Sequence, residues 1–164
     1  MGRSSAQVLG PGEGRSLAPA AGAAISLKSA SEETDGGWTL LEYSAPPHFA
    51  GPPPHWHAKM EEAFFVLEGT VRFDVDGEAV DVQAGGYARV PPGVVHRFSN
   101  PTDQPSRFLG LAVPGGLEKY LEELAEMMAN EPAWPPADMT PVTALMAAYD
   151  TFPPPATDRD TASP

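Results

Sequence analysis

Residues 51–69 read GPPPHWHAKMEEAFFVLEG, and this stretch decides how the rest of the chain is interpreted. Side chains two residues apart on an extended strand point to the same side. His55 and His57 therefore project together while Trp56 faces away, and the two imidazoles can share one cation. The aromatic and branched residues that follow Glu62 predict a second strand, which ends at Gly69. If the two strands are neighbours, the Glu62 carboxylate meets the histidine pair.

Residues 85–100 read GGYARVPPGVVHRFSN, and they can bring a third imidazole to the same place. A Pro-Pro-Gly turn at 91–93 leads into a predicted strand that contains His96. Three of the four histidines of the protein lie in the two stretches. Three nitrogen donors and one carboxylate suit Fe, Mn, Ni, Co, Cu or Zn, and they leave coordination positions open for water or substrate. The sequence predicts one divalent transition metal ion held by His55, His57, Glu62 and His96.

The two stretches resemble the two motifs of the cupin family. The first family motif is Gly, five residues, His, one, His, three or four, Glu, six, Gly; the matching residues here are His55, His57, Glu62 and Gly69. The second motif is Gly, five residues, Pro, one, Gly, two, His, three, Asn; every position matches, at Gly85, Pro91, Gly93, His96 and Asn100. One position departs, because Phe49 stands where the family has its first glycine and Gly51 lies two residues later. We therefore expect the loop that enters the first motif to follow a different path.

The chain from about residue 38 to residue 128 resembles bacterial single-domain cupins of the quercetin 2,3-dioxygenase-like group. This resemblance implies a redox metal and a dioxygenase-type oxidoreductase that acts on a small enolic or aromatic, flavonol-like compound with O2. Glu62 is then both a metal ligand and the candidate base for the substrate hydroxyl proton. Two alternatives stay open, since one fold carries many functions. One is a polyketide cyclase or isomerase that uses the metal as a Lewis acid, and the other is a non-catalytic cupin that binds a small ligand.

The hydrophobic pattern predicts an all-β fold, an antiparallel β-barrel or jelly roll with one or two C-terminal α-helices. Short strands are expected at 24–28, 38–44, 71–75, 78–82, 87–90, 94–98 and 107–113, with a hairpin turn at Asp76-Gly77. After Pro114 the apolar residues recur at helical spacing from Leu117 to Met128. A second short helix follows to Tyr149, with Thr140 as its N-cap.

Length and charge limit the possible functions further. A chain of 164 residues fits one domain, which we place at 17–150 between disordered tails at 1–16 and 151–164. The formal charge of -12 disfavours nucleic-acid and membrane-surface partners. The absence of cysteine excludes disulfides and thiolate ligands. No stretch approaches the roughly 20 apolar residues of a membrane-spanning helix. We expect a cytoplasmic protein with a small-molecule substrate, and a homodimer on the family resemblance alone.

Other polar residues are weaker candidates for the site. Glu61 fits the three-residue spacing of the first motif, but Gly69 then lies too far along the chain, so Glu62 is preferred as the ligand. His48 lies in the Pro-rich approach to the first motif and is expected on the surface. Asn100 is expected to stabilise a turn. The aromatic residues Trp38, Tyr43 and Phe49 could line a ligand cavity, but aromatic residues on barrel strands usually belong to the core, and we expect all three there.

Overall fold

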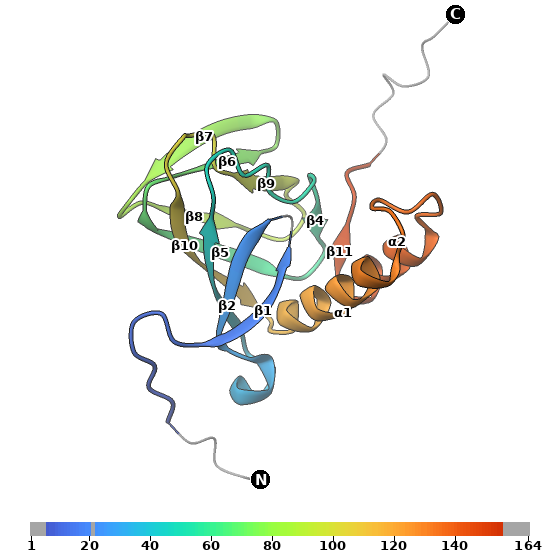
Figure 1. The fold of residues 1–164 in the computed structure, drawn as a ribbon, viewed down its shortest axis with the longest axis horizontal. Coiled ribbons are helices and arrows are strands. Elements are labelled where there is room, and N and C mark those ends of the chain that lie inside the picture. The colour runs from blue at the N-terminus through green and yellow to red at the C-terminus, as the bar shows by residue number, and fades with distance from the viewer. Residues whose placement is uncertain (1–5, 21, 156–164) are drawn as a thin grey trace, which may run out of the picture.

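The computed structural model describes residues 6–20 and 22–155, in which antiparallel strands precede two helices (Figure 1). The strands are β1 (Arg15–Ala20), β2 (Ala23–Ser29), β3 (Thr39–Ala45), β4 (Trp56–His57), β5 (Glu61–Glu68), β6 (Thr70–Val75), β7 (Glu78–Gln83), β8 (Tyr87–Val90), β9 (His96–Ser99), β10 (Ser106–Val113) and β11 (Thr151–Phe152). The helices are α1 (Leu117–Asn130) and α2 (Thr140–Ala148), and a short 3-10 helix spans Ser31–Thr34. The predicted all-β fold with C-terminal helices is confirmed.

Two sheets pack face to face around the core. The larger sheet has the strand order β1-β2-β3-β10-β5-β8, and the smaller has the order β7-β6-β9. Phe64 of the larger sheet contacts Phe73 and Phe98 of the smaller sheet, with ring centroids 5.2 and 5.5 Å apart. Both centroid distances lie in the range of aromatic contacts, so these rings join the two sheets. The alternation of buried and exposed residues along β5 and β10 therefore directs one face of each strand into a shared aromatic core.

The turn between β6 and β7 forms where Asp76-Gly77 predicts it. Both residues have positive φ, 49° and 87°, as a tight hairpin of this type requires. The strands on either side pair in register from Thr70 with Gln83 to Val75 with Glu78. This part of the fold follows from local turn chemistry alone.

The N-terminal part of the fold starts earlier than the sequence predicts. The predicted edge strand at 24–28 lies within β2, and β1 covers it as the true edge, with Leu17 paired to Ile25. Pro19 and Gly22 obscure this hairpin in the sequence, because both residues are disfavoured inside strands. Proline is tolerated on an edge strand, where its missing N–H costs no ladder hydrogen bond. Arg15 and Ser16 therefore belong to the sheet, whereas residues 6–14 are exposed and residues 1–5 lie outside the described chain.

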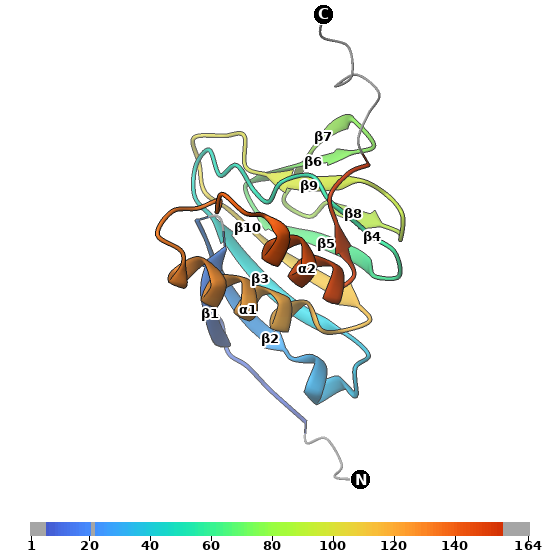
Figure 2. The same ribbon diagram turned by 90° about the vertical axis from the view of Figure 1, so that its right-hand side faces the viewer.

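Helix α1 is fastened at its first turn by a buried carboxylate. Figure 2 shows α1 lying against β1 and β3 with α2 beside it. Glu118 is only 1% exposed, and it accepts hydrogen bonds from the Ser31 backbone N–H at 2.8 Å and from the Ser31 and Thr39 hydroxyls. Burial opposes its ionisation, but these donors outweigh that cost and lower the pKa of Glu118. The hydrogen bonds fix where α1 crosses the end of the sandwich.

The C-terminal segment is ordered further than predicted. Thr151 and Phe152 form β11, which pairs with β4 of the first motif (Figure 1). The boundary at residue 150 is therefore wrong, while residues 156–164 lie outside the described chain. The short strand is invisible in the sequence because two residues next to three prolines carry no periodic signal. Thr140 is not the N-cap of α2; it lies inside the helix, and the Asp138 carboxylate accepts its N–H at 2.9 Å. Neither helix in the described chain has the length and apolar content needed to cross a membrane.

Candidate metal centre

The four predicted ligands meet at one end of the sandwich. Their ligand atoms lie within 4.8 Å of one another. His55 precedes β4 and bridges to His96 at the start of β9, with backbone hydrogen bonds of 2.8 and 3.0 Å. His57 ends β4 and Glu62 lies near the start of β5. Three of the four are almost fully buried, and His55 alone stays partly open to solvent.

The backbone holds each of the three imidazoles by the same ring nitrogen. Nδ1 of His55 lies 2.9 Å from the Pro53 carbonyl, and Nδ1 of His96 lies 3.0 Å from the Val94 carbonyl. Nδ1 of His57 lies 2.9 Å from a carbonyl of the C-terminal segment, that of Asp150. A carbonyl oxygen only accepts, so each Nδ1 carries the proton. Each Nε2 is then the free donor atom, which is the arrangement that orients histidines for metal binding.

The Nε2 atoms of His57 and His96 converge on the Glu62 carboxylate. Its Oε2 lies 2.7 Å from His96 Nε2 and 3.3 Å from His57 Nε2. With Nδ1 protonated, two lone-pair donors and an anion face each other unless a proton or a cation lies between them. His57 Nε2 is buried and has no hydrogen-bond partner in the described chain. A buried polar atom without a partner needs an explanation, and a bound cation supplies one, so the residues fit a divalent metal ion.

The electrostatics of the cluster in the absence of metal point the same way. Burial and the neighbouring His96 lower the pKa of His55 to about 4, so this ring is neutral at physiological pH. Burial opposes the charged form of His57, but Glu62 outweighs it and raises the pKa of that ring. Burial also opposes ionisation of Glu62, yet His57 and His96 hold the pKa of its carboxyl well below the usual range. The cluster thus offers an ionised carboxylate and a neutral His55 imidazole, and a metal ion would displace the proton that the raised pKa favours on His57.

A small pocket of about 80 Å³ opens beside the cluster. His55 and Glu62 form its polar side. The rest of the lining comes from Pro52, from aromatic rings of the sandwich and its loops and from side chains of α1: Tyr43, Phe49, Phe98, Leu117, Tyr120 and Leu121. Tyr43 and Phe49 therefore line the site as well as belonging to the core. The alternation along β3 predicts that Tyr43 faces inward, whereas Phe49 lies outside any strand. Trp38 is 45% exposed and takes no part.

In the loop that enters the first motif, glycine is found at position 51 and not at position 49, where the family motif has it. Gly51 has φ 75°, and a Cβ at this position would lie 1.6 Å from the carbonyl oxygen of Phe98. Gly51 is thus the residue at which the backbone crosses β9 closely, a place that only glycine can occupy. Phe49, at the position where the family motif has glycine, is free to point into the pocket. The loop with glycine at position 51 leaves the four candidate ligands together.

The weaker candidates lie away from the cluster. Glu61 points outward and pairs with Arg89, so it does not compete with Glu62 for the site. His48 is exposed. Asn100 is buried, donates to the carbonyls of Pro46 and Gln104 at 3.0 and 2.7 Å, and accepts from the Thr102 N–H at 3.0 Å. It therefore stabilises the turn before β10, as predicted.

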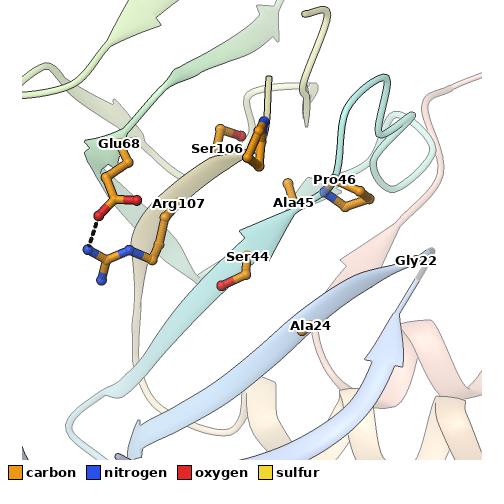
Figure 3. A pocket seen from close by; sticks show the side chains of 9 residues that line it. Gly22, Ala24, Ser44, Ala45, Pro46, Glu68, Ser106 and Arg107 are labelled. Carbon is orange, nitrogen blue, oxygen red and sulfur yellow. Dashed lines mark hydrogen bonds and ion pairs between the residues drawn. The ribbon is translucent and has the colours of Figure 1, made fainter. Parts of the chain in front are cut away.

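A larger cavity, of about 360 Å³, lies between β2, β3 and β10, away from the candidate ligands (Figure 3). Its charged residues are Arg107 and Glu68, which bond to each other at 2.5 Å. Arg107 also pairs with Glu42 at 3.0 Å. The ionic groups of this cavity thus satisfy one another, and the metal pocket is the better candidate for chemistry.

Three comparisons place the chain among known proteins. Residues 41–113 match the model of the cupin domain. The chain is 27% identical over 100 residues to quercetin 2,3-dioxygenase of Bacillus subtilis (61% of this chain, 29% of that protein) and 39% identical over 80 residues to gentisate 1,2-dioxygenase of a Streptomyces species (47% and 21%). It thus spans less than a third of either relative. The structure of KdgF from a Halomonas species superposes with a TM-score of 0.59 at 14% identity, over 68% of this chain and 96% of that one.

The fold and site together define a double-sheet antiparallel β-protein with a buried cluster suited to one metal ion. Within that class, residues 41–113 match the cupin domain, and the fold is similar to that of the superposed structure. All four candidate ligands belong to the two sequence motifs. Asp150 belongs to neither motif, although its carbonyl oxygen accepts a hydrogen bond from His57, 93 residues away in the chain.

Proposed function

We propose that the chain is a metal-dependent oxygenase that uses O2 to oxidise a small enolic or aromatic compound. The observation that carries the proposal is the cluster in which three histidines, each held through Nδ1, gather around one buried carboxylate with their ligand atoms within 4.8 Å of one another. The similarity to two dioxygenases supports oxygen chemistry. A homodimer belongs to the same proposal on the family resemblance.

His55, His57 and His96 would hold the metal through Nε2, and Glu62 through its carboxylate. A redox-capable metal bound there supplies the one-electron chemistry that lets O2 react with an organic molecule. Glu62, already ionised in the absence of metal, is also our candidate acceptor for the hydroxyl proton of an enolic substrate.

Tyr43 is the pocket residue best placed to bind a substrate oxygen. Its ring is fixed by stacking on Phe108 at 4.9 Å and by an edge contact with Phe98 at 5.4 Å. Its hydroxyl has no hydrogen-bond partner in the described chain, although the residue lines the pocket. Burial and the charge of Glu62 raise the pKa of Tyr43 far above its usual value, so the phenol stays protonated and acts as a donor.

The dimensions of the pocket limit the substrate. Pockets for drug-sized ligands usually measure about 300–1,000 Å³, whereas this one measures about 80 Å³. Phe49 and Phe98 give it flat apolar walls, and Leu117, Tyr120 and Leu121 of α1 exclude water from the other side. The volume favours a single ring or a short enol over a three-ring flavonol, which would fit only if α1 moved.

The proposal is tested by oxygen consumption. Protein stripped of metal is loaded with Fe, Mn, Co, Ni, Cu or Zn in turn and mixed with single-ring phenols and short enols at an oxygen electrode. We expect substrate-dependent O2 uptake with a redox-capable metal and none with Zn. Tyr43→Phe should lower kcat/KM by about 10-fold to 100-fold, since a hydrogen bond to a charged oxygen is lost. Turnover that survives strict removal of O2 would instead establish a cyclase or isomerase, and binding without turnover a ligand-binding cupin.

A further inference from the structure

Asp150 connects the C-terminal segment to the first metal motif by its main chain. It lies between α2 and β11 in the left-handed region, with φ 55°. Its carbonyl oxygen accepts the Nδ1 proton of His57 at 2.9 Å. The Thr151 hydroxyl lies farther from the same nitrogen, at 3.4 Å. The orientation of the His57 ring therefore depends chiefly on where Asp150 sits.

The side chain of Asp150 binds the loop that joins two of the candidate ligands. Its carboxylate accepts the backbone N–H of Ala58 at 3.2 Å, of Lys59 at 2.8 Å and of Met60 at 2.8 Å. These three residues lie between His57 and Glu62. Successive N–H groups that turn toward one anion form a concave nest, and hydrogen bonds to a charged acceptor are the strong ones. The carboxylate thus fixes the shape of the loop, and with it the separation of His57 from Glu62.

The segment that follows Asp150 is latched onto the same motif. Thr151 pairs with His57 and Phe152 with Trp56 in the β11–β4 ladder. The Trp56 ring packs on Phe152 at 4.9 Å, and its Nε1–H donates to the Pro153 carbonyl at 3.0 Å. Trp56 faces away from the metal cluster, so its role is to hold β11. These contacts keep Asp150 in place on the far side of β4.

We propose that Asp150 is a positioning residue for the metal centre, which sets the His57 ring through its carbonyl and the His57–Glu62 loop through its carboxylate. The inference rests on the metal binding proposed above and extends it to a residue outside both motifs. Asp150 does not touch the pocket. It acts through His57 and the loop, so its loss should weaken the site without removing a ligand.

The test uses the full chain and three variants. Asp150→Gly removes the carboxylate and tolerates the positive φ. Asp150→Asn keeps the shape, tolerates the same φ and loses the charge. Asp138→Asn is the matched control, because its carboxylate accepts a backbone N–H in the same segment but lies away from the site. Binding of Co²⁺ is measured by competition with a chelator, together with the visible absorption of the bound ion.

We expect both Asp150 variants to bind Co²⁺ about 10-fold to 100-fold more weakly than wild type, the usual cost of losing a group that orients a ligand. The Co²⁺ spectrum should shift as well, whereas Asp138→Asn should match wild type in both. Wild-type affinity and spectrum in the Asp150 variants would overturn the proposal. An equal loss in Asp138→Asn would also overturn it, because the effect would then be a general loosening of the segment.

A second measurement separates this inference from the proposed function. If wild-type protein binds no Co²⁺ or other divalent metal, the metal function fails, yet the contact between Asp150 and His57 is still observable by nitrogen NMR of the imidazoles in metal-free protein. The His57 Nδ1–H signal should shift or exchange faster with solvent in Asp150→Gly and stay unchanged in Asp138→Asn. An unchanged signal in Asp150→Gly would overturn the positioning role whether or not metal binds.

Discussion

Residues 51–100 and residues 138–153 contribute to the same site in different ways. The first region supplies all four candidate ligands, on strands whose motifs are readable in the sequence. The second supplies no ligand, and it contains no motif, but its carbonyl and carboxylate fix the ring of His57 and the loop that follows. The difference teaches that residue type and spacing encode the ligand set, whereas the orientation of the ligands is encoded by main-chain contacts from a distant segment.

The largest effect is expected from removing a ligand of the first region. His57→Ala deletes one of the three Nε2 donors. Metal content should fall from about one ion per chain to a small fraction of that, because the remaining three ligands bind the ion more weakly. The ring lies at the end of the sandwich, outside the aromatic cluster around Phe64, so the fold should persist. Elemental analysis measures the metal and circular dichroism the fold.

His48→Ala is the matched control, because His48 is exposed and belongs to neither motif. It should retain full metal content. Unchanged metal in His57→Ala would remove His57 from the ligand set and would leave the two regions without the contact on which their comparison depends.

Two truncations measure the contribution of the second region. Removal of residues 153–164 deletes the acceptor of the Trp56 Nε1–H and should cost about 1 kcal/mol of unfolding free energy. Removal of residues 150–164 also deletes β11 and the anion held by three N–H groups, and should cost several times more and weaken metal binding. Denaturant unfolding of the two metal-free proteins gives the comparison. Equal stability of the two truncated proteins would mean that Asp150 and β11 contribute nothing to the stability of the barrel.

The sequence predicts the barrel well because its signals are local. The Asp76-Gly77 hairpin, the alternation along β5 and the two metal motifs each depend on residues close in the chain. The sequence does not explain the glycine at position 51. That residue is required by the close approach of the backbone to β9, and this approach exists only in the folded protein. Asp150 could not be predicted at all. Its hydrogen bonds join groups 90 to 93 residues apart, and an isolated aspartate before a two-residue strand has no periodicity or motif to mark it.

Glu118 tests whether the C-terminal helices are attached independently of the metal site. Glu118→Gln keeps the shape of the side chain but removes its negative charge and replaces one acceptor oxygen with an NH2 donor. The Ser31 and Thr39 hydroxyl groups then face an amide in place of a carboxylate. We expect a loss of about 1–3 kcal/mol in unfolding free energy, the cost of an imperfectly paired buried polar group. Glu122→Gln removes a half-exposed carboxylate that pairs with Arg15, and it should change stability by less than about 0.5 kcal/mol. Metal affinity that fell in parallel with stability in Glu118→Gln would show that α1 and the site form one unit.

The smallest effect is expected where the two regions meet, in the pH dependence of the metal-free protein. The pKa of His57 is raised, so its contribution to stability is complete below its unfolded value of about 6.5 and is lost as pH rises through the folded value. Glu62 has a lowered pKa and His55 a pKa of about 4, so their contributions are present at neutral pH and are lost as the solution becomes acidic. Stability should therefore be greatest near pH 6.5 and decline on both sides, on the alkaline side through His57 and on the acid side through Glu62 and His55. Urea unfolding between pH 5 and 9 with a chelator present measures this pH dependence.

Loading the metal should abolish the alkaline decline, because the ion then replaces the proton on His57 Nε2. A decline that persisted in the loaded protein would mean that His57 is held by Asp150 but does not bind the ion.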